Sequence, residues 1–328
     1  MHVLVTGGAG FIGGHLAEAF LRDGHDVTVL DSLEPFYDVR IKRRTVDLHR
    51  EIAAAGDVEY TFREGDVRDT EAVGEAVAGA DVVVHQAAQA GVRTSVEQPR
   101  EVTEINVCGT VTLLEAAREA DVDRVILASS SSVYGKPESL PYNEDHPTEP
   151  VSPYGVSKLA QEQYARVYTE LHGLRTVALR YFTVYGPRMR PNMAISNFVS
   201  RCFNGEPPVI YGDGQQTRDF TYVADVVDVN RQLLTDDAAD GEVLNVGSGG
   251  TITIQRLAET IRDRIAPDLD IVHESARDAD AEHTHASVAK AGALLGYEPS
   301  RSIEDGVAEF IEWYRENRDW YEPLVRSS

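Results

Sequence analysis

The feature that most constrains this chain is a glycine-rich turn near its start. The segment TGGAGFIGGHL, residues 6–16, spaces three glycines three residues apart between a strand pattern and a helix pattern. Glycine permits positive φ and lets a backbone approach a ligand closely. The first turn of a helix adds free N–H groups and the positive end of a dipole, which suit a diphosphate. We therefore predict a dinucleotide-binding turn whose cofactor contacts are Gly7, Gly10, Phe11, Ile12 and Gly13.

Two acidic residues extend this prediction. Asp31 ends the second strand pattern about twenty residues after the turn, where a carboxylate accepts both ribose hydroxyls of an adenosine. The same charge repels a 2′-phosphate, so NAD is the expected cofactor rather than NADP. Asp66 ends the third strand pattern, and both contact with the adenine amino group and simple turn capping remain open for it.

Strand and helix patterns alternate over most of the chain. Strand patterns cover 2–7, 26–31, 58–66, 80–88, 124–129 and 174–182, and helix patterns cover 11–22, 101–120 and 152–173. This order is typical of an α/β fold with a doubly wound, mostly parallel sheet. Loop-rich segments follow residue 183, then helix patterns at 254–265 and 303–316, and the segment 242–248 is expected to return to the main sheet.

Hydroxyl groups follow the strand pattern at 124–129 in the segment ASSSSVYG. Tyr154 and Lys158 lie four residues apart, hence on one helix face. A tyrosine that acts as a base near neutral pH needs about 4 kcal/mol of preferential phenolate stabilisation, which the Lys158 ammonium and an oxidised nicotinamide can supply. A serine would hold a substrate hydroxyl while Tyr154 takes its proton and hydride leaves for the nicotinamide. Ser129 is expected only to satisfy nearby backbone groups.

Together these segments resemble the extended short-chain dehydrogenase/reductase family, and within it the nucleotide-sugar epimerases. The resemblance rests on TGGAGFIG, GDVRD, HQAAQAG, SSSSVYG, YGVSK, LRYFTVYGPR, GDGQQTRDFTYVADVV and LNVGS, which run nearly end to end. It implies a Rossmann domain for NAD, a smaller C-terminal lobe for the nucleotide sugar, and commonly a homodimer packed through helices. We place the NAD domain at 1–182, with a return segment near 219–248, and the substrate lobe at 183–328.

The resemblance also implies roles for single residues. It selects Ser130 as the catalytic serine, with Tyr154 and Lys158. The family's 4,6-dehydratases carry an Asp-Glu pair after this serine, where Ser131 and Ser132 stand here as substrate contacts, so dehydration is not expected. Further cofactor contacts implied by the matching motifs are Val67, Ala87, Ala88 and Asn106.

The implied reaction is 4-epimerisation of a UDP-sugar by oxidation at C4, rotation of the 4-keto sugar about its diphosphate, and hydride return. The segments DSLEPFYDVRIKRR, HQAAQAGVRTSVEQP and TVYGPRMRPNMAISNF are most similar to UDP-glucuronate 4-epimerases. Thr183 stands where UDP-galactose 4-epimerases usually carry asparagine. Arg188 and Arg190 are candidates for the sugar carboxylate, with Arg190 preferred, because guanidinium binds carboxylates in bidentate fashion.

Other activities remain as alternatives. One is a 4-epimerase of UDP-glucose, UDP-galactose or an N-acetylhexosamine, and a UDP-glucuronate decarboxylase ranks behind it because the glutamate of those enzymes is missing near the serine motif. A non-catalytic NAD sensor would be expected to have lost the serine, tyrosine or lysine. For the UDP half, the resemblance implies diphosphate contacts from Arg218 and Arg277, a ribose contact from Asp280, and Tyr211 near the base.

Charge and cysteine content limit the setting. The 54 acidic and 31 basic residues give a net charge of −23, which makes nucleic acid an unexpected partner. We favour adaptation to high salt over an ordinary acidic bacterial enzyme. No apolar run approaches the roughly 20 residues of a membrane span, and no secretion signal is recognised. Cys108 and Cys202 cannot make a disulfide framework or a zinc site, so no metal and a cytoplasmic location are expected.

Overall fold

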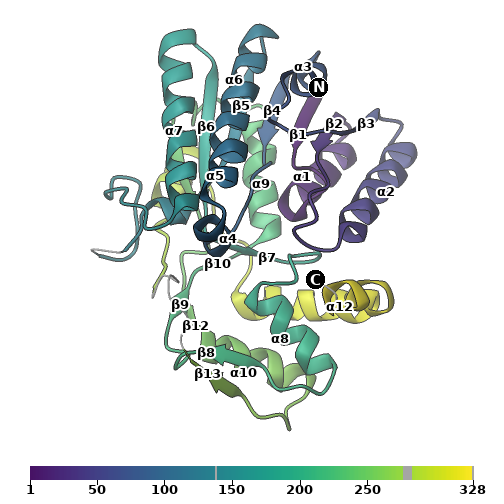
Figure 1. Ribbon diagram of the computed structural model, residues 1–328, viewed down its shortest axis with the longest axis vertical. Coiled ribbons are helices and arrows are strands. Elements are labelled where there is room, and N and C mark those ends of the chain that lie inside the picture. The colour runs from purple at the N-terminus through teal and green to yellow at the C-terminus, as the bar shows by residue number, and fades with distance from the viewer. Residues whose placement is uncertain (137–138, 276–282, 327–328) are drawn as a thin grey trace.

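The computed structural model describes residues 1–136, 139–275 and 283–326, and a parallel sheet forms its centre (Figure 1). Seven strands lie in the order β11-β6-β5-β4-β1-β2-β3, and every neighbouring pair is parallel. The prediction of a doubly wound parallel sheet is confirmed, including the return of 242–248 as its last strand. The strands are β1 (His2–Thr6), β2 (Asp26–Asp31), β3 (Tyr60–Glu64), β4 (Val82–His85), β5 (Arg124–Ser130), β6 (Arg175–Tyr181) and β11 (Val243–Val246).

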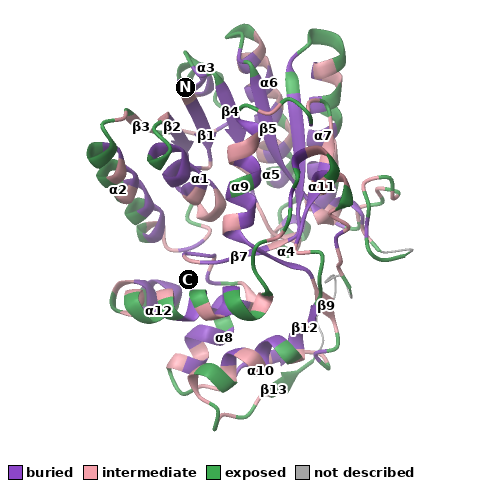
Figure 2. Ribbon diagram, turned by 180° about the vertical axis from the view of Figure 1, so that it is seen from behind, coloured by how far each residue is buried: buried purple, intermediate pink, exposed green. Residues whose placement is uncertain are grey.

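Successive residues of a buried strand face opposite sides of the sheet, and both sides are covered here. In β1, Val3 and Val5 belong to one core cluster and Leu4 to another. The first cluster includes apolar residues of α1 (Phe11–Arg22), α9 (Val223–Leu233) and α11 (Ala289–Leu295). The second includes residues of α3 (Thr70–Val77), α6 (Gly109–Glu119) and α7 (Pro153–His172). Helices therefore cover each face, as Figures 1 and 2 show.

The ends of α7 follow from its sequence. The Ser152 side chain accepts a hydrogen bond from the Gly155 N–H at 3.1 Å, and Pro153 occupies the first helical position, where its missing N–H costs nothing. Gly173 ends the helix with a φ of 70°, a left-handed conformation that glycine adopts without strain. These caps define the two ends of the helix that carries Tyr154 and Lys158.

The predicted helix over 101–120 is confirmed as a helical run from Pro99 to Glu119, but a π-helical turn lies inside it. The structure has α5 (Pro99–Thr103), then a π-helical turn over Glu104–Cys108, then α6. The widened turn carries Asn106, whose side chain accepts a hydrogen bond from the Gln89 N–H at 2.8 Å and donates to Ser157 Oγ at 2.9 Å. Those partners are distant in sequence, so helical periodicity gives no sign of them. Such π-bulges commonly occur at functional sites.

A second apolar core lies beyond the carboxyl ends of the main strands, in the lower half of Figure 1. It is built mainly from α8 (Ala194–Phe203), α10 (Ile254–Ile265) and α12 (Ile303–Arg326). The last helix runs past the predicted end at residue 316 because Tyr321, Leu324 and Val325 are buried in this core. Three small strand pairs border it: β7 (Thr183–Tyr185) with β10 (Phe220–Tyr222), β8 (Val209–Tyr211) with β13 (Val272–Glu274), and β9 (Thr217–Arg218) with β12 (Ile252–Thr253).

Two further helices are α2 (Val39–Gly56), which the sequence analysis did not predict, and α4 (Val92–Glu97), which precedes α5. A 3₁₀ turn covers Ser131–Val133. None of the helices within the described ranges combines the length and apolarity needed to cross a membrane. The division of the chain at residue 182 remains a prediction, since α9 and β11 follow that point and still belong to the main sheet.

Candidate active site

A cavity opens at the carboxyl edge of the sheet, where the glycine turn meets α1. Its wall includes all five residues predicted from that turn: Gly7, Gly10, Phe11, Ile12 and Gly13. A Cβ added to Gly13 would lie 2.3 Å from the Gly7 carbonyl oxygen, and Gly7 itself has a φ of 68°. The turn is thus closed so tightly that only glycine fits at residue 13, and the first residues of α1 lie in the cavity wall. This arrangement fits the diphosphate of a dinucleotide.

Asp31 lies in the cavity wall, and its carboxylate is held by the backbone. Its two oxygens accept hydrogen bonds from the N–H groups of Leu33 at 2.9 Å and Ala9 at 3.1 Å. Lys42 Nζ lies 3.6 Å from the same carboxylate, and both side chains are almost fully buried. The site therefore offers both an acceptor and a donor to ribose hydroxyls.

The remaining predicted cofactor residues separate into two groups. Asp66, Val67, Ala87 and Ala88 line the cavity. The Arg68 guanidinium beside Asp66 holds the pKa of that carboxyl below its ordinary value. Asn106 instead lies behind the wall, fully buried, with its amide bound to Gln89 and Ser157. Its contact with a nicotinamide therefore stays a prediction, whereas its support of the wall is visible.

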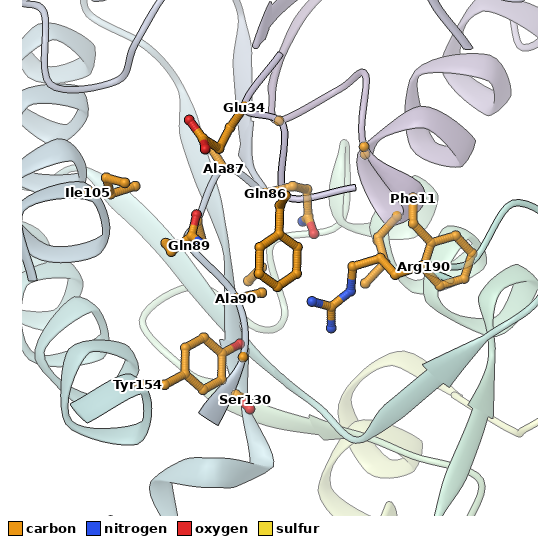
Figure 3. A pocket seen from close by; sticks show the side chains of 18 of the residues that line it. Phe11, Glu34, Gln86, Ala87, Gln89, Ala90, Ile105, Ser130, Tyr154 and Arg190 are labelled. Carbon is orange, nitrogen blue, oxygen red and sulfur yellow. The ribbon is translucent and has the colours of Figure 1, made fainter. Parts of the chain in front are cut away.

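Ser130, Tyr154 and Lys158 come together at the same cavity, with Ser131 and Ser132 beside them. Figure 3 shows Ser130 and Tyr154 at one end of the pocket, with the Arg190 guanidinium pointing into it. Lys158 is 2% exposed, its Nζ donates to the Ala128 carbonyl at 2.7 Å, and it lies 5.9 Å from the centre of the Tyr154 ring. One helix face and one strand end thus assemble a hydroxyl, a phenol and an amine.

Burial opposes the charged forms of both helix residues. It lowers the pKa of Lys158 to about 7, and the Glu162 carboxylate acts in the opposite direction. Burial raises the pKa of Tyr154, against lowering effects from the Arg190 charge and a hydrogen bond with Ser130. Tyr154 is therefore protonated at neutral pH in the absence of further positive charge. An oxidised nicotinamide would supply that charge when bound.

The expectation for Ser129 is wrong. Its hydroxyl does not satisfy neighbouring backbone groups but donates to Glu162 Oε1 at 2.5 Å. The serine belongs to β5 rather than to the loop that follows, and it is 4% exposed. Its side chain thus links the strand to α7 one turn beyond Lys158.

A second, larger cavity adjoins the first and extends towards the C-terminal core. Thr183 and Arg190 line both cavities, and Tyr211 and Arg218 line the second. These four predicted substrate residues are therefore brought to one continuous space. The other two, Arg277 and Asp280, lie outside the residues that the structure describes.

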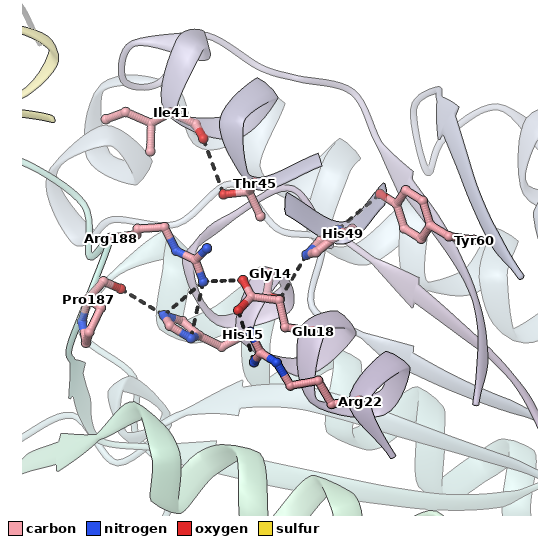
Figure 4. A network of polar contacts seen from close by, with 10 residues as sticks. All are labelled: Gly14, His15, Glu18, Arg22, Ile41, Thr45, His49, Tyr60, Pro187 and Arg188. Carbon is pink, nitrogen blue, oxygen red and sulfur yellow. Dashed lines mark hydrogen bonds and ion pairs between the residues drawn. The ribbon is translucent and has the colours of Figure 1, made fainter. Parts of the chain in front are cut away.

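The two arginine candidates have different surroundings. Arg188 is turned away from both cavities and pairs with Glu18 of α1, as Figure 4 shows. His15 accepts from Arg188 at Nδ1 (3.3 Å) and donates through Nε2 to the Pro187 carbonyl at 2.8 Å. Burial and then the charge of Arg188 lower the pKa of His15 to about 3, which keeps the ring neutral. Arg188 thus anchors the loop, and Arg190 is the residue presented to the ligand space.

Sequence reasoning missed some residues of the site. Lys42 had a usable signal, because lysine occurs at only four positions, and both Lys42 and Lys158 line the cavity. Phe36 lines both cavities, and the Arg190 guanidinium lies 5.6 Å from its ring centre. Gln86 and Tyr181, which are hydrogen-bonded at 3.2 Å, also line the first cavity; both lie within motifs that carry the family resemblance, HQAAQAG and LRYFTVYGPR, which offered a signal for them.

The fold and this site define a dinucleotide-dependent oxidoreductase-like protein of the short-chain dehydrogenase class. The chain belongs to the NAD dependent epimerase/dehydratase family, whose sequence profile it matches over residues 3–247. The predictions of this family, of an enzyme, and of NAD as its cofactor are confirmed at that level.

Similar proteins span nearly the whole chain. It is 35% identical to a probable UDP-glucuronate 4-epimerase of Rhizobium meliloti, over 97% of this chain and 98% of the relative. It is equally 35% identical to a putative UDP-glucose 4-epimerase of Methanocaldococcus jannaschii, over 96% and 99%. A crystal structure of UDP-glucuronic acid 4-epimerase from Bacillus cereus, in complex with UDP-glucuronic acid and NAD, superposes with a TM-score of 0.89 at 33% identity, covering 96% of this chain and 99% of that one. Since relatives named for two different sugars are equally similar, overall identity does not select the substrate.

Proposed function

We propose that this protein is an NAD-dependent UDP-sugar 4-epimerase that prefers UDP-glucuronate. The observation that carries the sugar preference is Arg190, a partly buried guanidinium that lines both cavities near Tyr154. Within the described residues, no carboxylate forms an ion pair with it. A guanidinium held out of water without a partner is costly, and a sugar carboxylate would compensate it. UDP-glucose or UDP-galactose, the alternative substrates, would leave this charge unpaired.

The residues divide the reaction between them. Bound NAD supplies a hydride acceptor and a positive charge. Tyr154 removes the proton of the C4 hydroxyl, Ser130 orients that hydroxyl, and the Lys158 ammonium stabilises the phenolate. Arg218 in the second cavity holds the diphosphate while the 4-keto sugar turns over. Return of hydride to the opposite face and of the proton from Tyr154 completes the inversion.

A uronic substrate adds a second requirement. Oxidation at C4 makes a β-keto acid, which loses CO₂ when the carboxylate C–C bond aligns with the carbonyl π system. Arg190 and Thr183 can fix the carboxylate away from that alignment, since both lie in the wall shared by the two cavities. Ser131 and Ser132 stand where an acid–base pair would be needed for dehydration. These features support epimerisation over decarboxylation and dehydration.

Substitution of Arg190 by methionine tests the substrate assignment. We expect KM for UDP-glucuronate to rise by about 10- to 100-fold, because a hydrogen-bonded charge pair contributes about 1.5–3 kcal/mol. The effect on UDP-glucose should be much smaller. Epimer formation from UDP-glucuronate, UDP-glucose and UDP-N-acetylglucosamine, followed by NMR in high salt, gives the measurement. If only the uncharged sugars react, or the variant affects all three equally, the uronate proposal is wrong.

We also propose that the protein is a homodimer packed through α7. Three apolar side chains of this helix are exposed in the single chain: Val156, Tyr164 and Leu171 at 54%, 41% and 72%. Their spacing places them within about 80° of one another around the helix. Exposed apolar residues that recur along one face of a surface helix are typical of an interface. A second copy of the same helix would bury it.

The charge balance supports adaptation to high salt. Most ion pairs of the described residues are surface pairs, many of them close in sequence, and they contribute little each. The net charge of −23 therefore leaves a large uncompensated repulsion that only screening relieves.

Replacing Tyr164 with glutamate tests the interface. In high salt, sedimentation is expected to give a dimer for the unmodified protein and a monomer for Tyr164→Glu. Thermal unfolding tests the salt adaptation, because removing the added salt should lower the melting temperature of the unmodified protein. A monomer at every concentration refutes the interface, and a melting temperature independent of salt refutes the adaptation.

A further inference from the structure

The carboxylate of Glu162 lies buried behind the catalytic residues and has charged and polar partners on two strands. It is four residues beyond Lys158 on α7, and its side chain is 2% exposed. Arg180 of β6 donates to both carboxylate oxygens, through Nε at 2.9 Å and Nη2 at 2.8 Å. Ser129 of β5 donates to Oε1 at 2.5 Å. The carboxylate is thus fixed by three hydrogen bonds.

The strand register explains why these partners converge. Ser129 of β5 lies directly opposite Arg180 of β6 in the parallel sheet. One carboxylate from α7 therefore binds a matched pair of residues on neighbouring strands. Lys158, one turn earlier on α7, donates a hydrogen bond to the carbonyl of Ala128. Ser130 follows Ser129 in the same strand. Three consecutive residues of β5 are thereby placed against successive turns of α7.

We propose that Glu162, held by Arg180 and Ser129, is a positioning residue that fixes α7 against β5 and holds a negative charge one helical turn from the Lys158 amine. This inference rests on the proposed function, because it assigns the roles of base and cation to Tyr154 and Lys158. Glu162 itself touches neither substrate nor cofactor in this arrangement: its contacts are Ser129 and Arg180.

The charge state of the Lys158 amine depends on the titratable groups that surround it. On α7 these are Tyr154 and Glu162, and Glu162 is the one described carboxylate that raises the lysine's pKa. From β4, burial and then the charge of Lys158 lower the pKa of His85 to about 3, so its ring is neutral. From β6, Tyr181 shares the cavity as a neutral phenol, because burial raises its pKa to about 12.

The other neighbours contribute no charge that replaces Glu162. The π-helical turn and α6 offer the amide of Asn106 and the hydroxyl of Thr110, and β5 offers the Ala128 carbonyl. Arg180 binds the carboxylate through Nε and Nη2, and its Nη1 also donates to the Tyr134 hydroxyl at 2.8 Å. Arg180 therefore orients Glu162.

A purely structural role is the alternative, because a buried ion pair alone is weak support for any function. The structural and the electrostatic role predict different effects for two substitutions of Glu162. Glutamine keeps the shape of Glu162 and removes its charge, whereas aspartate keeps the charge and shortens the arm. A structural role predicts that Glu162→Asp is at least as damaging as Glu162→Gln and that neither moves the pH profile. An electrostatic role predicts that only Glu162→Gln moves it.

Burial already brings the pKa of Lys158 to about 7, so loss of the Glu162 charge leaves the amine neutral at lower pH. A neutral amine no longer stabilises the Tyr154 phenolate, and the phenol ionises only at higher pH. The bell-shaped turnover profile for Glu162→Gln should therefore narrow: its alkaline limb, which loss of the Lys158 proton sets, moves down, and its acid limb moves up by about one pH unit. For Glu162→Asp both limbs should stay in place although turnover falls.

The experiment measures these profiles for the NAD-loaded protein in high salt. Because Glu162→Gln leaves the Arg180 charge buried without its partner, the double variant Glu162→Gln/Arg180→Met is a second test that removes both charges. It should fold and show the same upward shift. Superimposable pH profiles for the unmodified, Glu162→Gln and Glu162→Asp proteins, or equal shifts in both single variants, would overturn the proposal.

A second readout separates this inference from the proposed function. The near-ultraviolet absorbance of phenolate, corrected by Tyr154→Phe, follows the ionisation of Tyr154 without any turnover. If no UDP-sugar is epimerised but the titration still moves upward in Glu162→Gln alone, the proposed substrate fails and the positioning role stands. If epimerisation occurs and the titration does not move, the positioning role fails.

Discussion

Replacing Tyr154 by phenylalanine is expected to lower the rate of epimerisation by about 10³-fold, within the range for loss of a general base. The phenol has the Ser130 hydroxyl beside it and Arg190 within electrostatic reach. Phenylalanine keeps the ring and its packing while removing the only group of this trio that can take the C4 proton. Binding of NAD and of the UDP-sugar should change little, because the glycine turn and the second cavity are untouched.

A matched control is available on the same helix. Tyr164 is exposed on α7, ten residues beyond Tyr154, so Tyr164→Phe removes a phenol of the same kind outside the cavity and keeps the apolar ring that the proposed interface would bury. Turnover of both variants, with calorimetric affinities for NAD and substrate, gives the comparison. Full turnover in Tyr154→Phe would refute the mechanism, whereas equal losses in the two variants would indicate a general effect on the helix.

The pH dependence follows from the same residue. Burial raises the pKa of Tyr154, so the base form is scarce at neutral pH unless positive charge is near. Lys158 provides this charge only while protonated, and burial lowers its pKa to about 7. Protonation of Tyr154 therefore limits turnover on the acid side and loss of the Lys158 proton limits it on the alkaline side, a bell-shaped profile that belongs to the coupled pair.

Replacing Gly13 by alanine is expected to weaken NAD binding by about 10- to 100-fold. The added Cβ would lie 2.3 Å from the Gly7 carbonyl oxygen and 3.0 Å from the Gly8 Cα, both of them backbone atoms that cannot rotate away. Relief requires the turn to open, which costs about 1–3 kcal/mol for an overpacked site and moves the N–H groups that face the diphosphate.

Gly74 provides the control for this prediction. It lies in α3, and a Cβ at this position would meet nothing within 4 Å. Gly74→Ala should leave NAD affinity unchanged and slightly stabilise the helix, since alanine has the higher helix propensity. Calorimetric titration of NAD into both folded variants measures the two affinities. Unchanged affinity in Gly13→Ala would mean that the turn does not hold the cofactor.

The sheet and the glycine turn could be predicted from the sequence because their signals are local. Val3 and Val5 face one core and Leu4 the other, so a buried parallel strand appears as a short continuous apolar run. The spacing of Tyr154 and Lys158 likewise contains its own geometry, since residues four apart share a helix face.

Other parts could not be predicted because they depend on contacts between distant segments. Asn106 binds residues 17 and 51 positions away, and these bonds accompany the π-helical turn that interrupts the expected helix. Arg188 has a φ of 60°, which turns its side chain towards α1 while Arg190, two residues later, enters the ligand space. The role of Ser129 depends on the register between β5 and β6, which no local pattern records.

The attachment of Arg188 to α1 has a consequence for how such a protein can diverge. Helix α1, whose first turn lines the first cavity, also binds the segment that leads to Arg190. Its Glu18 pairs with Arg188, and its His15 donates to the Pro187 carbonyl. A mutation that tilts this helix disturbs both ligands at once, so it offers a poor route to a new sugar preference. Phe36 and Thr183 belong to other segments of the wall that both cavities share, and substitutions there leave the attachment of Arg188 to α1 intact.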